Sequence, residues 1–194
     1  MKLTIHRSSE HDLITGCRRR EGNAQRELYE LYSSRMYAVG YRYVKNPMEA
    51  EDILITSFTK IFERIDQFKG DGSFEGWIRR IVVNESLTFL RRNRSMYLET
   101  DIEQADREPD YAQLDNQLEA EDLLKIIQEL PPGYRVVFNM YAIDGYSHKE
   151  IADHLGISEN TSKSQLSRAR TYLQKMLADY DCVSTKEMKS DEAT

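Results

Sequence analysis

The chain has 194 residues, with 33 acidic and 27 basic side chains and a net charge of −6. This length suits one domain or two small ones, and no stretch approaches the roughly 18 apolar residues of a membrane span. The first twenty residues lack an apolar signal-peptide segment, and Cys17 and Cys182 have no CxxC or Cys/His neighbours. We therefore expect a cytoplasmic protein with no disulfide, metal or cofactor.

Charge is distributed unevenly along the chain. Between Glu99 and Asp122 there are ten acids and one base, so this segment carries −9 and the rest of the chain sums to +3. Basic residues gather instead in 77–94 and 161–176. Two basic segments on either side of an acidic one indicate a protein that binds a polyanion.

Apolar spacing predicts helices throughout, with little alternation typical of strands. In chain order, the expected helices are Glu10–Arg20, Ala24–Lys45, Pro47–Ile65, Phe74–Arg94, Asp115–Leu130, Gly133–Asp144, Ser147–Leu155 and Glu159–Asp179. The acidic stretch contains few apolar residues and a proline, which favours a flexible linker. The expected fold is all-α, with two small helical domains at 1–94 and 115–179, an acidic linker at 95–114 and a polar, frayed tail at 180–194.

The segment from Tyr146 to Leu173 has the pattern of a helix-turn-helix. Ser147 and Glu150 form a capping box at the start of one helix, and Gly156 suits a left-handed turn. Ser158 can cap the second helix, in which Ser162 falls where a branched apolar residue is usual. The residues expected to face the core are Ile151, Ala152, Leu155, Leu166, Ala169 and Leu173.

The second helix of such a motif enters the major groove of DNA and presents polar side chains to base edges and phosphates. The residues that we expect on its outer side are Lys163, Ser164, Gln165, Ser167 and Arg168. The alternative is a helical hairpin whose polar face is merely solvated.

In the N-terminal half, a glycine-containing loop precedes a basic helix. We expect Ser73 to cap that helix and Phe68 to be exposed beside the loop, an arrangement suited to single-stranded nucleic acid. Phe68 in the core is the alternative, and Trp77 is expected to be core. The candidate contacts are Phe68, Lys69, Gly70, Asp71, Arg80 and Asn84.

The helix that begins at Asn46-Pro47 has more apolar residues than one buried stripe needs, and Ile55 lies outside that stripe. An additional exposed apolar residue can indicate a protein partner, although a single one is ordinary.

Three stretches together resemble a bacterial sigma factor of the extracytoplasmic-function (ECF) group, within the sigma-70 family. They are LYELYSSRMYAVGYRYVKNPMEAEDIL, FKGDGSFEGWIRRIVVNESLTFLRR and LPPGYRVVFNMYAIDGYSHKEIADHLGISENTSKSQLSRAR. The resemblance implies an RNA polymerase sigma factor that directs promoter-specific initiation and strand opening. Its implied partners are core RNA polymerase, promoter DNA and an anti-sigma factor, with no insertion of the chain into a membrane.

The resemblance also implies roles for individual residues. Phe68 and the Lys69–Ser73 loop would hold a flipped non-template base of the minus-ten element, and Asn84 would help to recognise that strand. The second helix of the helix-turn-helix would meet the minus-thirty-five element. The helix around 50–65 would dock on the clamp of the polymerase. The residues expected to bind polymerase are Glu49, Asp52, Ile53, Ile55, Thr56 and Phe58.

Three positions depart from the family pattern. Ile55-Thr56 replaces a usual Gln-Glu pair in the clamp-binding helix, and Gln165 stands where arginine is common. The main rival function is a helix-turn-helix regulator that does not join polymerase. An enzyme is not expected, because the four histidines make no ligand set and the chain has neither a phosphate-binding glycine loop nor a nucleophile–base pair.

Overall fold

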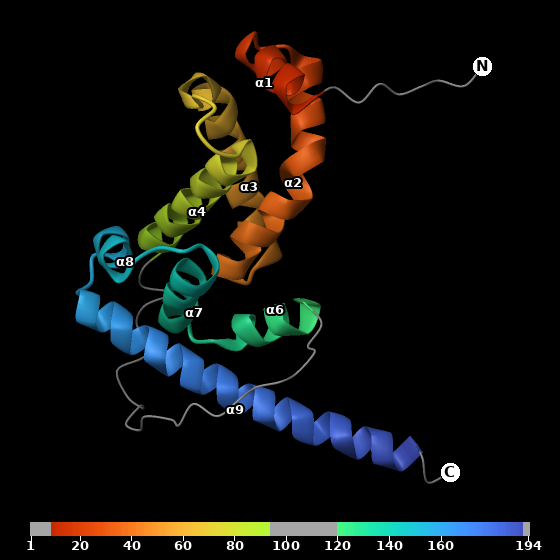
Figure 1. Cartoon of the computed structure of the whole chain (residues 1–194), viewed down its shortest axis with the longest axis vertical. Helices are drawn as coiled ribbons and strands as arrows, with labels where there is room; N and C mark the ends of the chain where they lie inside the picture. The colour runs from red at the N-terminus through yellow and green to blue at the C-terminus, as the bar shows by residue number, and fades with distance from the viewer. Residues whose placement is uncertain (1–8, 94–119, 192–194) are drawn as a thin grey trace. The chain divides into compact units, whose positions relative to one another are not determined.

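The computed structural model describes residues 9–93 and 120–191, and within these ranges every element is helical. The chain folds into two compact units, Met1–Leu90 and Arg91–Thr194 (Figure 1). The predicted acidic linker at 95–114 lies outside the described residues, as does the start of the helix expected at Asp115.

The first unit contains α1 (Glu10–Arg18), α2 (Gly22–Val44), α3 (Pro47–Arg64), a 3-10 turn (Ile65–Gln67) and α4 (Phe74–Arg92). Its core is a single apolar layer between the helices, with Leu28, Tyr43, Ile61, Ile78 and Leu87 fully buried.

Local sequence explains where the helices of the first unit begin and end. The side chain of Asn46 accepts hydrogen bonds from the amides of Met48 and Glu49, and Pro47 occupies the first turn of α3. Lys45 adopts a left-handed conformation (φ 62°) that ends α2. The expected break between α2 and α3 at Asn46-Pro47 is therefore confirmed.

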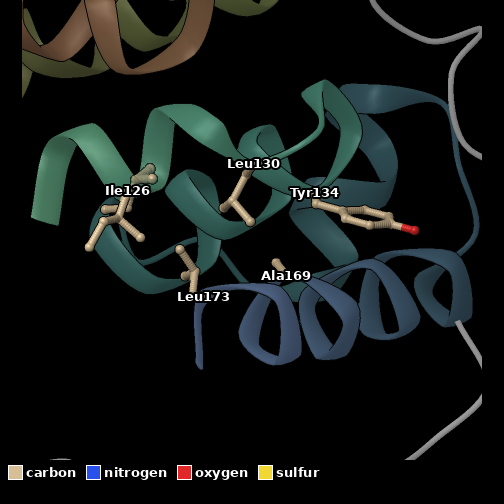
Figure 2. Packing of buried hydrophobic residues seen from close by; sticks show 6 residues of the cluster. Ile126, Leu130, Tyr134, Ala169 and Leu173 are labelled. Atoms are coloured by element: carbon tan, nitrogen blue, oxygen red, sulfur yellow. The ribbon is translucent and has the colours of Figure 1, made fainter. Parts of the chain in front are cut away.

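The second unit contains α6 (Ala120–Glu129), α7 (Pro132–Phe138), a π-helical turn (Asn139–Ile143), α8 (His148–Leu155) and α9 (Glu159–Asp191). Figure 2 shows its core, in which Leu130 and Tyr134 face Ala169 and Leu173 of α9. Ile126 and Ile127 complete this cluster.

The second unit differs in two details from the helices expected. The helix expected over Gly133–Asp144 changes to a π-helical turn at Asn139, where the amide of Asp144 bonds to the carbonyl of Asn139 at 2.9 Å. The tail expected to fray after Asp179 continues α9 to Asp191, because residues 180–191 contain no proline or glycine to end a helix.

Candidate nucleic-acid interface

Phe68 is buried and does not offer an exposed ring. It is 8% exposed, and its ring packs edge-on against Phe74, with centroids 5.1 Å apart. The ring of Trp77 lies 5.8 Å from that of Phe68 and stacks on Phe74 at 5.6 Å, so the three rings form one mutual cluster. The expectation of an exposed aromatic ring was therefore wrong. Packing Phe68 against Phe74 and Trp77 removes its apolar surface from water, which is more favourable than leaving the ring exposed.

The loop that follows, Lys69–Ser73, is exposed throughout and anchored at both ends. At its start, the amide of Phe68 bonds to the carbonyl of Ile65 at 3.2 Å. At its end, the hydroxyl of Ser73 accepts the amide of Gly76 at 3.0 Å, which confirms the predicted cap of α4.

Gly70 and Gly72 give this loop its turn, with φ of 85° and 88°. Side chains larger than glycine resist that region, and neither glycine has a neighbouring atom where a Cβ would lie. The loop is therefore an open, exposed turn between two fixed ends.

On α4, the predicted polar face is present but only partly exposed. Arg80 and Arg91 are exposed, whereas Asn84 is half-buried, and the Thr88 hydroxyl bonds to the Asn84 carbonyl at 2.8 Å. Asn84 is therefore less accessible to solvent than Arg80 and Arg91.

The structure divides the residues predicted to bind polymerase into two groups. Asp52, Ile55 and Thr56 are exposed on α3, with Ile55 61% exposed, and Glu49 is half-buried. Ile53 and Phe58 are buried in the first unit, and Phe58 packs against Tyr29. The expectation that Ile53 and Phe58 contact polymerase is therefore not supported, because both side chains are buried against the rest of the first unit.

The helix-turn-helix has the predicted local geometry. Ser147 and Glu150 form a reciprocal capping box at α8, and Gly156 ends α8 in a left-handed conformation (φ 67°). The Ser158 hydroxyl accepts the amide of Thr161 at 3.0 Å in the first turn of α9. Leu166, Ala169 and Leu173 are buried, as expected from their spacing.

The predicted reading face of α9 is mostly open to solvent. Lys163, Ser164 and Ser167 are exposed, and Arg168 is half-buried. Gln165 is half-buried beside the first turn of α7, where a Cβ on Gly133 would lie 3.4 Å from its amide nitrogen. The outer face of α9 therefore consists of Lys163, Ser164 and Ser167, with Gln165 and Arg168 at its margins.

The sequence analysis did not identify two residues that support these surfaces, His148 and Arg18. His148 bonds to the buried hydroxyl of Ser162 at 2.9 Å, and Arg18 donates to the carbonyl of Phe68 at 2.6 Å. Ser162 gave a signal, since a polar residue at an apolar position needs a buried partner. Arg18 gave none, because fifty positions separate it from Phe68.

Within residues 9–93 and 120–191, no helix has the length and apolar character needed to cross a membrane. In the same ranges, no three His, Cys, Asp or Glu side chains are grouped so that they could hold a metal ion.

The structure thus defines an all-helical protein of two units, the second of which contains a helix-turn-helix. The family described as Sigma-70 region 2 matches residues 28–96, and the family described as Sigma-70, region 4 matches residues 120–173. The chain therefore belongs to the sigma-70 family of RNA polymerase sigma factors, in its ECF group. A regulator with only the helix-turn-helix would not match region 2.

Relatives carry the same description. The ECF RNA polymerase sigma factor SigE of Mycolicibacterium smegmatis is 32% identical over 79% of this chain, and the alignment spans 62% of the relative's length. SigW of Bacillus subtilis is 28% identical over 79% of this chain and 88% of its own length. The solved structure of the sigma factor RpoE of Bartonella quintana, in complex with the anti-sigma factor NepR, is 22% identical, with a TM-score of 0.48 and coverage of 79% of this chain and 96% of that chain.

Proposed function

We propose that this chain binds core RNA polymerase and directs it to promoters through a minus-ten contact in the first unit and a minus-thirty-five contact in the second. The observation that carries this proposal is the match of regions 2 and 4 in one chain, each with an exposed polar surface. Members of this family are initiation factors rather than catalysts. The sequence analysis likewise predicts no catalytic site.

The proposed minus-ten surface is the Lys69–Ser73 loop with the exposed arginines of α4. An open turn with two fixed ends can receive an unstacked base, and cations nearby can follow the phosphates. In this proposal the buried ring of Phe68 supports the start of the loop and does not stack on a base. Asn84, half-buried on the same helix, would contribute an amide to the same strand.

The proposed minus-thirty-five surface is the outer face of α9. Lys163 can hold a phosphate or the acceptor edge of guanine, and the hydroxyls of Ser164 and Ser167 can bond to either. Arg168 at the margin is suited to a phosphate. Gln165 sits against α7, so an adenine contact would require its side chain to turn outward.

The proposed polymerase surface is the exposed side of α3, formed by Asp52, Ile55 and Thr56 with Glu49 at its border. The domain limits 1–94, 95–114 and 115–179 remain part of the proposal, while the polar tail 180–194 continues α9 as far as Asp191. It also retains an anti-sigma factor as the regulatory partner, which would cover the polymerase and DNA surfaces together.

Binding of the purified full chain to bacterial core RNA polymerase, followed by fluorescence anisotropy, tests the proposal. We expect Asp52→Ala to weaken binding by about tenfold, because it removes a charged contact. Glu63→Ala is the matched control, since it removes the same charge from an exposed site at the other end of α3. If the folded wild type does not bind at micromolar concentration, the proposal is wrong and the plain regulator is favoured.

A second experiment tests promoter recognition. Core polymerase and this chain would transcribe a DNA library randomised in its minus-ten and minus-thirty-five blocks, and the transcribed templates would be sequenced. We expect base preferences in both blocks. The Lys163→Ala variant should lose base preference in the minus-thirty-five block and keep it in the minus-ten block. Lys149→Ala, which removes an exposed lysine on α8, serves as the control for charge.

A further inference from the structure

The last turn of α1 contacts the start of the loop that we assign to the minus-ten element. The Nη2 of Arg18 donates a hydrogen bond to the carbonyl oxygen of Phe68 at 2.6 Å, in a partly buried position. The Nε of Arg18 also lies 3.9 Å from the carboxylate of Asp66. One guanidinium therefore contacts the chain on both sides of Gln67, immediately before the loop leaves the core.

Arg18 can act as a fixed point because α1 is itself tightly docked. Leu13, Ile14 and Cys17 are buried, and a Cβ on Gly16 would lie 2.6 Å from the Cβ of Ala24. Real Cβ atoms do not approach so closely, so only glycine allows α1 to lie at this distance from the start of α2.

The N-terminal end of α1 is fixed as well. The Ser9 side chain and Asp12 form a capping box, and the hydroxyl of Tyr32 on α2 donates a hydrogen bond to Glu10. With both ends of α1 attached, rotation of the helix that would withdraw Arg18 from Phe68 is opposed.

The other end of the loop is linked to the same scaffold. The ring of Tyr32 packs edge-on against Phe74, the first residue of α4, with centroids 5.8 Å apart. Next to it, Arg35 of α2 pairs with Glu75 at 2.6 Å. Contacts from α1 and α2 therefore hold both ends of the loop, whose middle contains two conformationally permissive glycines.

We propose that Arg18 is a positioning residue for minus-ten recognition, which sets the direction in which Lys69–Ser73 leaves the core. A charged donor bonded to the Phe68 carbonyl fixes the peptide plane between Phe68 and Lys69. A loop already held in its binding conformation loses less entropy when it receives a base. This inference rests on the proposed function of the loop, and α1 precedes the residues 28–96 that match region 2.

The test uses the randomised promoter library with the full-length variants Arg18→Ala, Arg18→Lys and Arg19→Ala. Arg19 is the matched control, since it is the next residue, carries the same charge and is 72% exposed, with only a long contact to Glu21 at 3.9 Å. We expect Arg18→Ala to reduce base preference in the minus-ten block by about fivefold, because a charged hydrogen bond is lost. The minus-thirty-five preference and the affinity for core polymerase should not change.

Arg18→Lys retains a charged donor, so it should restore part of the minus-ten preference, and Arg19→Ala should behave as the wild type. An unchanged minus-ten preference in Arg18→Ala would overturn the inference. So would an equal loss in both blocks accompanied by a lower melting temperature, since that pattern belongs to a merely structural residue. Failure of the wild type to transcribe the library would instead contradict the proposed function, which keeps the two results apart.

Discussion

The hydroxyl of Ser162 lies 2.9 Å from Nδ1 of His148, and this hydrogen bond joins the two helices of the helix-turn-helix. Ser162 is fully buried at a position where a branched apolar residue is usual. His148 also stacks on Tyr141, with ring centroids 4.5 Å apart, so the imidazole is held from two sides. A polar pair thus replaces apolar packing between α8 and α9.

Loss of this hydrogen bond should destabilise the second unit. Ser162→Ala leaves Nδ1 of His148 without its partner, which should lower the free energy of unfolding by about 1 kcal/mol and the melting temperature by roughly 4–8 °C. Circular dichroism of the full chain would follow the transition. Ser164→Ala, an exposed serine on the same helix, should have little effect. Equal melting of Ser162→Ala and wild type would mean that the pair contributes nothing.

Stability of the second unit should also depend on pH through His148. Burial lowers the pKa of this imidazole below its ordinary value of 6.5, and Lys163 and Arg170 of α9 lower it further, while Glu159 opposes them. Tyr141 packs on the ring from the π-helical turn. The unfolded chain therefore binds a proton more readily than the folded one, and stability should fall as pH decreases below about 6.5.

A non-titrating substitution isolates this dependence. His148→Asn retains a side chain able to bond to Ser162, so the fall in melting temperature between neutral and acidic pH should be smaller than in the wild type. An identical pH profile in His148→Asn and wild type would exclude His148 as its source.

Substitutions at the adjacent residues Phe68 and Lys69 should affect different properties, the first stability and the second minus-ten binding. Phe68→Ala removes a buried ring that packs against both Phe74 and Trp77, so it should cost about 3–5 kcal/mol of stability in the first unit. Fluorescence of Trp77, the single tryptophan, would report that loss directly. Lys69→Ala should keep stability and weaken minus-ten binding. Unchanged stability in Phe68→Ala would restore the exposed, base-stacking interpretation.

The exposed pair Ile55-Thr56 should limit affinity for polymerase. Replacing it with the Gln-Glu pair usual in the family, through Ile55→Gln and Thr56→Glu, adds an amide and a carboxylate to an exposed helical face. We expect core polymerase to bind this double variant about three- to tenfold more tightly, because polar contacts across such an interface are partly charge-assisted. Thr59→Glu, one turn further along α3, is the control. Weaker binding of the double variant would indicate that Ile55 itself makes the contact.

Local signals were enough to predict most helices and the inner face of the helix-turn-helix. Ser147, Gly156 and Asn46 act on amides and carbonyls within a few residues of themselves, so their effects can be predicted without knowledge of the fold. Leu166, Ala169 and Leu173 follow from helical spacing alone. The departure at Ser162 was also visible, although its partner was not.

Only the tertiary structure decided what the sequence pattern left open around the candidate surfaces. Ile53 and Phe58 share a helix with Asp52 and Ile55, yet packing against the neighbouring helices buries the first two and leaves the others exposed. The burial of Phe68 and its bond to Arg18 likewise depend on helices that meet across long stretches of chain. By itself, the sequence determined most of the helices and the family, and it predicted two DNA-binding surfaces. Which side chains support those surfaces, and which can touch a partner, is determined by contacts between distant segments, because burial and hydrogen-bond partners exist only once those segments have come together.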